Sequence, residues 1–152
     1  MSDIVTESHV FVDCKAATID EVLSFFAEKT VELGFADDAN AIFEAFKARE
    51  AEGTTGMTGG FAIPHAKTAA VKDATVLVAK FAADVEWPSM DDAPIKCAIA
   101  LLIPAAEAGS THLRLLSKIA VMLMDAHKRE ELLAENDPAK LAALVSEGIS
   151  EE

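Results

Sequence analysis

Basic residues are scarce in this chain of 152 residues. Its 13 lysines and arginines stand against 26 aspartates and glutamates, which gives a formal charge of −13. Nucleic-acid binding needs a basic face that displaces counterions from phosphates, and attraction to anionic lipid also needs basic charge. The charge balance therefore argues against both kinds of partner. It leaves other partners open, because an acidic surface is also a common route to solubility.

Long apolar runs and cysteine pairs are missing as well. The longest apolar runs, such as CAIALLIPAA at 97–106, fall well short of the roughly 20 residues of a membrane-spanning helix. The start, MSDIVTESHV, lacks the basic and apolar parts of a signal peptide, so we expect a cytoplasmic protein. Cys14 and Cys97 have no C-x-x-C spacing. We expect reduced core thiols, although the sequence alone leaves a disulfide open.

What is present is the composition of a folded domain. Hydrophobic residues make up 51% of the chain, which excludes disorder, and the length suits a single domain over 1–152. Because the segment 94–104 is apolar on both faces, we expect a central strand covered on each side. The pattern predicts an α/β three-layer sandwich, with a small mixed β-sheet flanked by helices on both faces. The expected strands are 9–14, 61–63, 75–81 and 94–104, and the expected helices are about 18–34, 37–53, 111–124, 126–135 and 138–147.

A glycine-rich segment, GTTGMTGGFAIPHAKT at 53–68, is the strongest local signal of function. Its glycines can adopt positive φ and allow backbone N–H groups to approach a ligand closely. Pro64 fixes its own φ and has no N–H, so we expect His65 to leave the sheet in a restricted direction. A histidine at a strand end, beside such a turn, suits a nucleophile.

Residue types alone leave a second interpretation of this segment open, namely a flexible loop followed by a surface histidine. Other site classes fit less well. No histidine or cysteine has the spacing of a metalloprotease helix or a zinc finger, and the Gly-Lys-Ser/Thr ending of a Walker loop is absent. Nothing resembles the G-x-S-x-G elbow of a hydrolase.

Four segments in order carry a resemblance that favours the functional interpretation. They are ARE (48–50), the glycine-rich turn with its AIPHA ending, VEWPSMDDAPIKCAIALLIP (85–104) and STHLRLLSKIAVMLMD (110–125). Together they resemble the IIA component of the bacterial phosphoenolpyruvate-dependent sugar phosphotransferase system, in its fructose/mannitol family. The resemblance runs from the first strand to the last helix. Each motif is weak alone, and the set in this order is specific.

The resemblance implies a phosphotransferase that works as a phosphocarrier. His65 aligns with the family's phosphorylated histidine, which accepts a phosphoryl group from the carrier protein HPr. In this family the acceptor nitrogen is usually Nε2, and the group then passes to a cysteine of a IIB domain. The resemblance implies uptake of a fructose-type sugar with concomitant phosphorylation, and it implies no metal and no dissociable cofactor.

Arg49 aligns with the family's arginine, and physical chemistry supports a role at the phosphoryl group. A phosphoryl group adds about −1.5 to −2 charges at neutral pH, in a chain that is already strongly acidic. The planar guanidinium can hold two phosphoryl oxygens at once, which lysine cannot. The alternative is a helix-end cation that only offsets the helix dipole.

Three further residues complete the expected site. His112 matches the family's second histidine, and a helix N-terminus favours a nearby anion, so His112 would orient His65 or stabilise the phosphoryl group. The alternative for His112 is a packing residue. Thr55, or Thr54 in its place, would donate a hydroxyl to the phosphate, and Gly60 belongs to the same expected phosphate-binding loop.

Two rival functions stay open. Nitrogen-related IIA proteins share the loop and the histidine, serve no transporter, and act through phosphorylation-dependent binding. A binding domain that has lost transfer is the other rival, which the combination of Arg49, His65 and His112 argues against. The sequence leaves the sugar, the oligomeric state and membership of a longer IIA-IIB-IIC chain undetermined.

Overall fold

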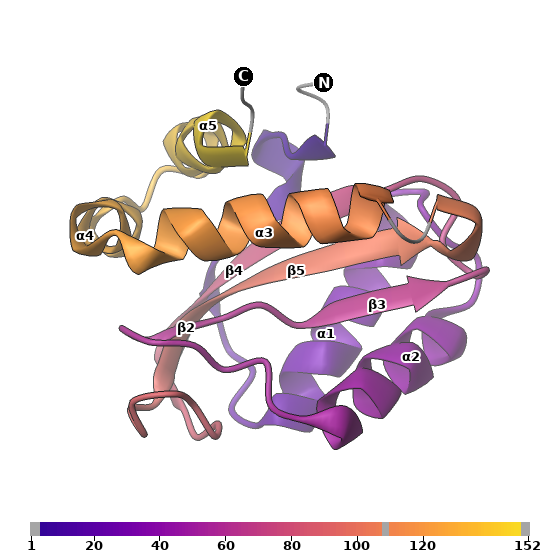
Figure 1. Ribbon diagram of the computed structural model, residues 1–152, viewed down its shortest axis with the longest axis horizontal. Helices are drawn as coiled ribbons and strands as arrows, with labels where there is room; N and C mark the ends of the chain where they lie inside the picture. The colour runs from indigo at the N-terminus through magenta and orange to yellow at the C-terminus, as the bar shows by residue number, and fades with distance from the viewer. Residues whose placement is uncertain (1–3, 108–109, 150–152) are drawn as a thin grey trace.

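The protein alternates helices and strands in the expected order. The computed structural model describes residues 4–107 and 110–149, without the side chains of 107 and 110–112 (Figure 1). The strands are β1 (Val10–Cys14), β2 (Phe61–Ala62), β3 (His65–Thr68), β4 (Thr75–Val85) and β5 (Ile95–Pro104); the helices are η2 (Glu7–His9), α1 (Ile19–Glu32), α2 (Ala39–Glu52), η3 (Ala105–Glu107), α3 (Ser110–Met124), α4 (Ala126–Ala134) and α5 (Pro138–Ile149). Each expected strand and helix is present, with shifts of a few residues at the ends.

The sheet is mixed and central. Its strand order is β1-β4-β5-β2, and β3 also pairs with β5. β4 and β5 are antiparallel, whereas β1, β2 and β3 each run parallel to the strand that they pair with. Helices α1 and α2 lie on one face of the sheet, and α3 and α5 lie on the other (Figure 1). The predicted three-layer α/β sandwich is confirmed.

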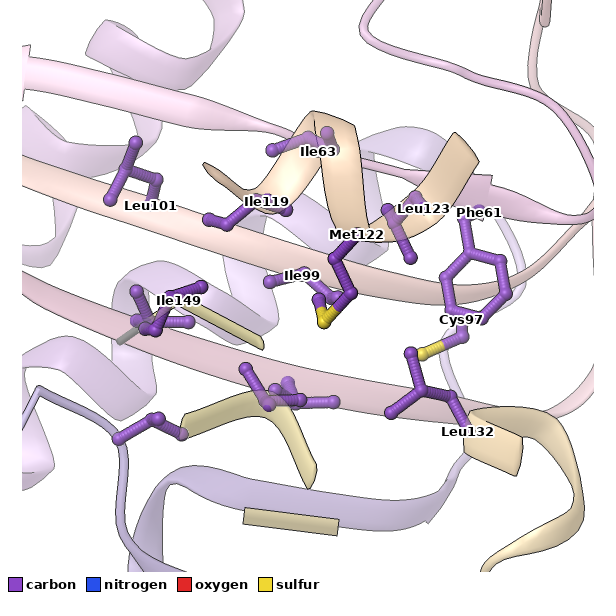
Figure 2. Close-up of a cluster of buried hydrophobic side chains, with 14 of the residues drawn as sticks. Phe61, Ile63, Cys97, Ile99, Leu101, Ile119, Met122, Leu123, Leu132 and Ile149 are labelled. Carbon is purple, nitrogen blue, oxygen red and sulfur yellow. The ribbon is translucent and has the colours of Figure 1, made fainter. Parts of the chain in front are cut away.

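Two hydrophobic cores fill the spaces between the layers, and β5 contributes to both. Ile99 and Leu101 belong to the core under α3, α4 and α5, which Figure 2 shows in part, whereas Ala98 and Leu102 belong to the core over α1 and α2. Successive side chains of a strand point to opposite faces, so a strand covered on both faces is apolar along its length, as β5 is from Cys97 to Pro104. The predicted double-sided burial of this strand is confirmed.

Local signals set the ends of the first two helices. The Thr18 hydroxyl accepts the Glu21 N–H at 3.1 Å and caps α1. Gly34 follows α1 with φ +88, a conformation that favours glycine. Asp38, one of the two aspartates considered as the cap of α2, accepts the Ala41 N–H at 3.2 Å.

Pro64 does not turn the chain out of the sheet, so that expectation was wrong. Ala62 pairs with Ala98 and His65 pairs with Leu101, which keeps the same register on β5 across Ile63 and Pro64. β2 and β3 are therefore one outer strand with a short interruption. The Pro64 carbonyl still accepts the Leu101 N–H at 3.0 Å, and an outer strand tolerates the missing donor of a proline.

Two other expectations concern the membrane and the thiols. None of the helices in the described part of the chain is both long and apolar enough to cross a bilayer. Cys14 and Cys97 are buried, free thiols, as expected for reduced core residues.

Candidate functional site

The unbroken register of the outer strand decides which way His65 faces. Phe61 and Ile63 point into the core under α3, where Figure 2 shows Ile63 near Ile119 and Phe61 near Leu123 and Cys97. Alternation along the strand places the His65 side chain on the same face, at the next position of that face. His65 is only 7% exposed. The strand therefore holds the imidazole in a protected position at the edge of the sheet.

The partners of the two ring nitrogens determine the tautomer of His65. Nδ1 lies 2.9 Å from the carbonyl oxygen of Ile63, and Nε2 lies 3.0 Å from Nε of Arg49. A carbonyl oxygen only accepts hydrogen bonds and a guanidinium only donates them. The neutral ring therefore carries its proton on Nδ1 and turns the lone pair of Nε2 toward Arg49. Nε2 is therefore the ring nitrogen with the available lone pair, which accepts the Arg49 hydrogen bond.

Arg49 reaches the histidine from the opposite layer. It lies in the last turn of α2, which packs on the other face of the sheet, and its Nε reaches Nε2 of His65. Its Nη1 donates to the Gly53 carbonyl at 2.7 Å. Arg49 thus satisfies a carbonyl just past the helix end, which was the alternative role, and it also contacts the proposed nucleophile.

The turn after α2 holds both candidate threonines. The Thr54 hydroxyl donates to the Pro88 carbonyl at 2.6 Å. The Thr55 hydroxyl donates to Oε2 of Glu50, and the Thr55 N–H donates to Oε1 of the same carboxylate at 3.3 Å. Both hydroxyls are therefore bound to groups of the protein itself, and a direct phosphate contact by either one stays a prediction.

Glu50 is the residue that the sequence reasoning missed. It follows Arg49 directly, within the same ARE motif. One signal could have found it, because a carboxylate in the last turn of a helix is disfavoured by the negative end of the helix dipole. Glu52 lies in the same turn and is exposed, so the position alone does not single out Glu50; its two hydrogen bonds to Thr55 do.

The structure does not bring Gly60 next to His65. Gly60 has φ +89, and its carbonyl accepts the N–H groups of Lys96 and Cys97 at 2.7 and 3.1 Å. It lies beside the start of β5, whereas His65 pairs with Leu101, four positions after Cys97. At the rise of a strand this separation is about 13 Å. Gly60 shapes the approach to the outer strand.

His112 lies in the first turn of α3, and its side chain falls outside the described residues. The predicted role of His112 at the phosphoryl group therefore stays a prediction. Among the side chains that the structure describes, no group of three or more His, Cys, Asp or Glu could hold a metal ion. The chemistry available at the described site is that of a neutral imidazole beside a guanidinium.

Comparison with known proteins shows the family. The model of the family described as "Phosphoenolpyruvate-dependent sugar phosphotransferase system, EIIA 2" matches residues 3–148. The chain belongs to this family. The resemblance inferred from the four sequence segments is thereby confirmed.

The relatives of this EIIA protein have two kinds of name. It is 41% identical over 117 residues to a "PTS system fructose-specific EIIA component" of Haloferax volcanii, which covers 77% of this chain and 75% of that protein. It is 35% identical over 118 residues to a "Nitrogen regulatory protein" of Pseudomonas aeruginosa, which covers 78% of this chain and 73% of that protein.

Solved structures of EIIA proteins share the fold. The crystal structure of the nitrogen regulatory protein IIA-Ntr from Neisseria meningitidis superposes with a TM-score of 0.87 at 28% identity, over 95% of this chain and 97% of that one. Crystalline mannitol IIA from Escherichia coli gives a TM-score of 0.73 at 21% identity, over 91% and 96%. Both superpositions cover the α/β sandwich that holds the site.

Proposed function

We propose that this EIIA protein is a cytoplasmic phosphocarrier. Nε2 of His65 accepts a phosphoryl group from the phosphohistidine of HPr and passes it to a cysteine of a IIB domain, for uptake and phosphorylation of a fructose-type sugar. The orientation of the His65 ring carries the proposal. Nδ1 donates to the Ile63 carbonyl, so the lone pair of Nε2 faces the Arg49 guanidinium, where an anionic group would be stabilised.

The two transfer steps balance without a cofactor. In the first, the Nε2 lone pair attacks phosphorus, and the P–N bond to the HPr histidine breaks, with its electron pair returning to that nitrogen. The Ile63 carbonyl then stabilises positive charge on the His65 ring through the Nδ1 proton. In the second, the cysteine thiolate of IIB attacks phosphorus and the electron pair of the P–N bond returns to Nε2. Positioning and charge stabilisation supply the catalysis for such loose transition states.

Arg49 has two tasks in this cycle. Before transfer its Nε–H group donates to Nε2 of His65, and this hydrogen bond must break before Nε2 can attack. After transfer the guanidinium binds phosphoryl oxygens and offsets their charge. We propose that His112, in the first turn of α3, serves the same phosphoryl group. Thr55 contributes its hydroxyl only if it releases Glu50.

A regulatory role is the second candidate, and the structural comparison favours it. The structure with the TM-score of 0.87 is that of a protein named nitrogen regulatory, and the Pseudomonas aeruginosa relative carries the same name. In such a role the site takes phosphate in the same way. The phosphorylated and unphosphorylated forms then differ in which protein they bind, and no sugar transporter receives the group.

Phosphorylation by purified HPr tests the site. The protein is incubated with phosphoenolpyruvate, enzyme I and HPr, followed by intact mass measurement and site mapping. We expect one acid-labile, alkali-stable phosphoryl group on His65, and none on His65→Ala. His127→Ala is the control, because the His127 side chain is 75% exposed on α4, and it should take phosphate normally. Absence of phosphate uptake by the wild-type protein would overturn the proposed function.

The second half of the cycle separates transport from regulation. The phosphorylated protein is mixed with a fructose-type IIB domain or with its Cys→Ser variant. Transfer to IIB, and none to the variant, supports the carrier role. A phosphoryl group that stays on His65 with every IIB domain tried, together with a binding partner that distinguishes the two forms, supports regulation.

A further inference from the structure

Glu50 carries the wrong charge for its place. It lies in the last turn of α2, next to Arg49, where the helix dipole already disfavours a carboxylate. A phosphoryl group on His65 would add further negative charge nearby. Electrostatics alone would favour a neutral or basic residue at this position. Glu52 in the same turn is exposed to solvent, whereas the Glu50 carboxylate is bound within the protein, to Thr55.

A continuous path of hydrogen bonds leads from Glu50 to the ring of His65. The Glu50 carboxylate accepts the N–H and the hydroxyl of Thr55. The Thr55 carbonyl accepts the Ile63 N–H at 3.0 Å. The Ile63 carbonyl in turn accepts the Nδ1 proton of His65 at 2.9 Å. The Ile63 carbonyl, which selects the tautomer of His65, is thus aligned by Thr55, and Glu50 holds Thr55 in place.

The other side of the ring depends on the same turn. Arg49 donates through Nε to Nε2 of His65 and through Nη1 to the Gly53 carbonyl. Gly53 begins the short turn that Glu50 closes at Thr55. Arg49 and Glu50, adjacent at the end of α2, therefore hold the two ends of one turn. The described hydrogen bonds to Nδ1 and Nε2 of His65 both depend on this turn.

We propose that Glu50 is a positioning residue for phosphoryl transfer at His65. By holding Thr55 it fixes the turn 53–56, and through this turn it aligns the Ile63 carbonyl and the Arg49 guanidinium on the two ring nitrogens. The inference rests on the proposed function of His65. It differs from the expectation that Thr55 binds phosphate, because here the task of Thr55 is to bind Glu50.

Transfer kinetics of Glu50→Gln and Glu50→Ala test the proposal. Glutamine keeps the length and one acceptor oxygen, whereas alanine removes both. We expect kcat for phosphorylation by phospho-HPr to fall by about 10-fold and about 100-fold, respectively, because small misplacements of reacting groups have effects of that size. KM for phospho-HPr should change by less than about twofold, since the turn orients groups already inside the protein. Glu52→Gln, the same charge change on an exposed neighbour, should leave both unchanged.

The sign of the change excludes a purely electrostatic role. If Glu50 acted only by its charge, removing the charge would favour the incoming phosphoryl group and speed up transfer. Wild-type rates or faster rates in Glu50→Gln and Glu50→Ala would overturn the proposal.

The tautomer of His65 gives a readout that needs no phosphate. Nitrogen-15 chemical shifts of the ring should show the Nδ1–H form in the wild type and a mixture of both tautomers in a folded Glu50→Ala protein. A variant that keeps the wild-type tautomer would overturn the proposal. If Glu50→Ala does not fold, Glu50→Gln takes its place. If the wild type takes no phosphate while the tautomer changes in the variant, the proposed function falls and positioning by Glu50 stands.

A double-mutant cycle with Thr55→Val separates positioning from a direct phosphate contact. If Thr55 acts through Glu50, the double variant transfers no more slowly than the slower single variant. If the rate losses multiply, Thr55 acts independently of Glu50, and the proposal is overturned.

Discussion

The imidazole of His65 lies between two groups of opposite kind, a carbonyl at Nδ1 and a guanidinium at Nε2. The sequence predicted both His65 and Arg49 as site residues. It gave no physical reason to choose a ring nitrogen, because the choice depends on the carbonyl of Ile63, which only the folded strand aligns with the ring. The family resemblance implied Nε2, and the hydrogen bonds reach the same nitrogen independently.

Replacing Arg49 should slow transfer without unfolding the protein. Arg49→Ala should lower the transfer rate by about 100-fold or more, because a charged donor to the transition state is lost. The transfer rate of Arg49→Lys should lie between those of the wild type and Arg49→Ala, since an ammonium keeps the charge but lacks the planar fork. Single-turnover phosphorylation by phospho-HPr measures the rate, and thermal unfolding checks the fold.

Lys47→Ala is the matched control for Arg49. Lys47 is a cation on the same helix, two residues earlier, and it pairs with the exposed Asp20. The Lys47→Ala protein should transfer phosphate at the wild-type rate. An Arg49→Ala protein with the wild-type rate would remove Arg49 from the mechanism.

At the scale of elements, the outer strand decides the position of the site. Pro64 was expected to direct the chain away from the sheet, and the chain instead resumes pairing at His65. Sequence reasoning could not find this, because the partner of the strand is β5, more than 30 residues later in the printed sequence. The position of Gly60 could not be found from the sequence for the same reason. Gly60 lies in the expected loop, but pairing with β5 places it beside the start of that strand, away from His65.

The two inner strands of the sheet, β4 and β5, also bury ionisable groups. Cys97 of β5 pairs with Lys80 of β4, and the Lys80 ammonium donates to the carbonyls of Leu133 and Glu135 at the end of α4. Burial lowers the pKa of Lys80. Lys80 thus fastens α4 to the sheet through carbonyls that the helix itself cannot satisfy.

Cys97 should be unreactive in the native protein. Burial raises the pKa of its thiol from 9.0 to about 12. At pH 8 the thiolate fraction is then roughly 10⁻⁴, and the thiolate is the reactive form. Labelling with a thiol reagent, followed by site mapping, should show Cys97 protected until guanidinium unfolds the chain. Labelling of native Cys97 at the rate of the unfolded chain would contradict this.

The raised pKa of Cys97 also makes the free energy of unfolding depend on pH. Below pH 9 the thiol is protonated in both states, and its contribution to the free energy of unfolding is fully present. As the pH rises from 9 toward 12, the unfolded chain loses the proton first, so this contribution is progressively lost. Lys80, whose pKa is lowered by burial, acts in the opposite direction, and the two groups interact electrostatically.

At the scale of the whole molecule, the charge of −13 is the dominant feature. Several surface ion pairs exist, such as Lys72 with Asp37 and Lys96 with Asp84, but they are exposed and each is worth little. Repulsion among the many unpaired acidic charges acts over longer distances. It should therefore outweigh these ion pairs in the response of stability to salt.

Salt should stabilise this protein. Raising NaCl from about 20 mM to about 0.5 M shortens the Debye length from roughly 20 Å to roughly 4 Å, which screens the repulsion. We expect Tm to rise by about 3 °C or more, measured by circular dichroism. The double variant E44Q/E130Q, at two exposed sites, should have a higher Tm at low salt and a weaker salt dependence. A Tm that falls with salt would mean that ion pairs dominate.

The sequence by itself determined most of the elements, the layers and the chemical identity of the main site residues, but not the strand His65–Thr68. Helix caps such as Thr18 and the apolar run of the central strand are local patterns, and each depends on the backbone of its own segment. The site role of Arg49 was predicted from its position at a helix end before a short turn together with the family resemblance.

Only the tertiary structure decided how these residues are joined. The pairing of His65 with β5, the tautomer of its ring and the holding of Thr55 by Glu50 depend on which carbonyls and carboxylates other segments bring close. Which groups form a hydrogen bond depends on their positions in space, and the spacing of residues in the sequence does not give those positions. For that reason a carboxylate with the wrong charge for its helix end became interpretable only in the folded chain.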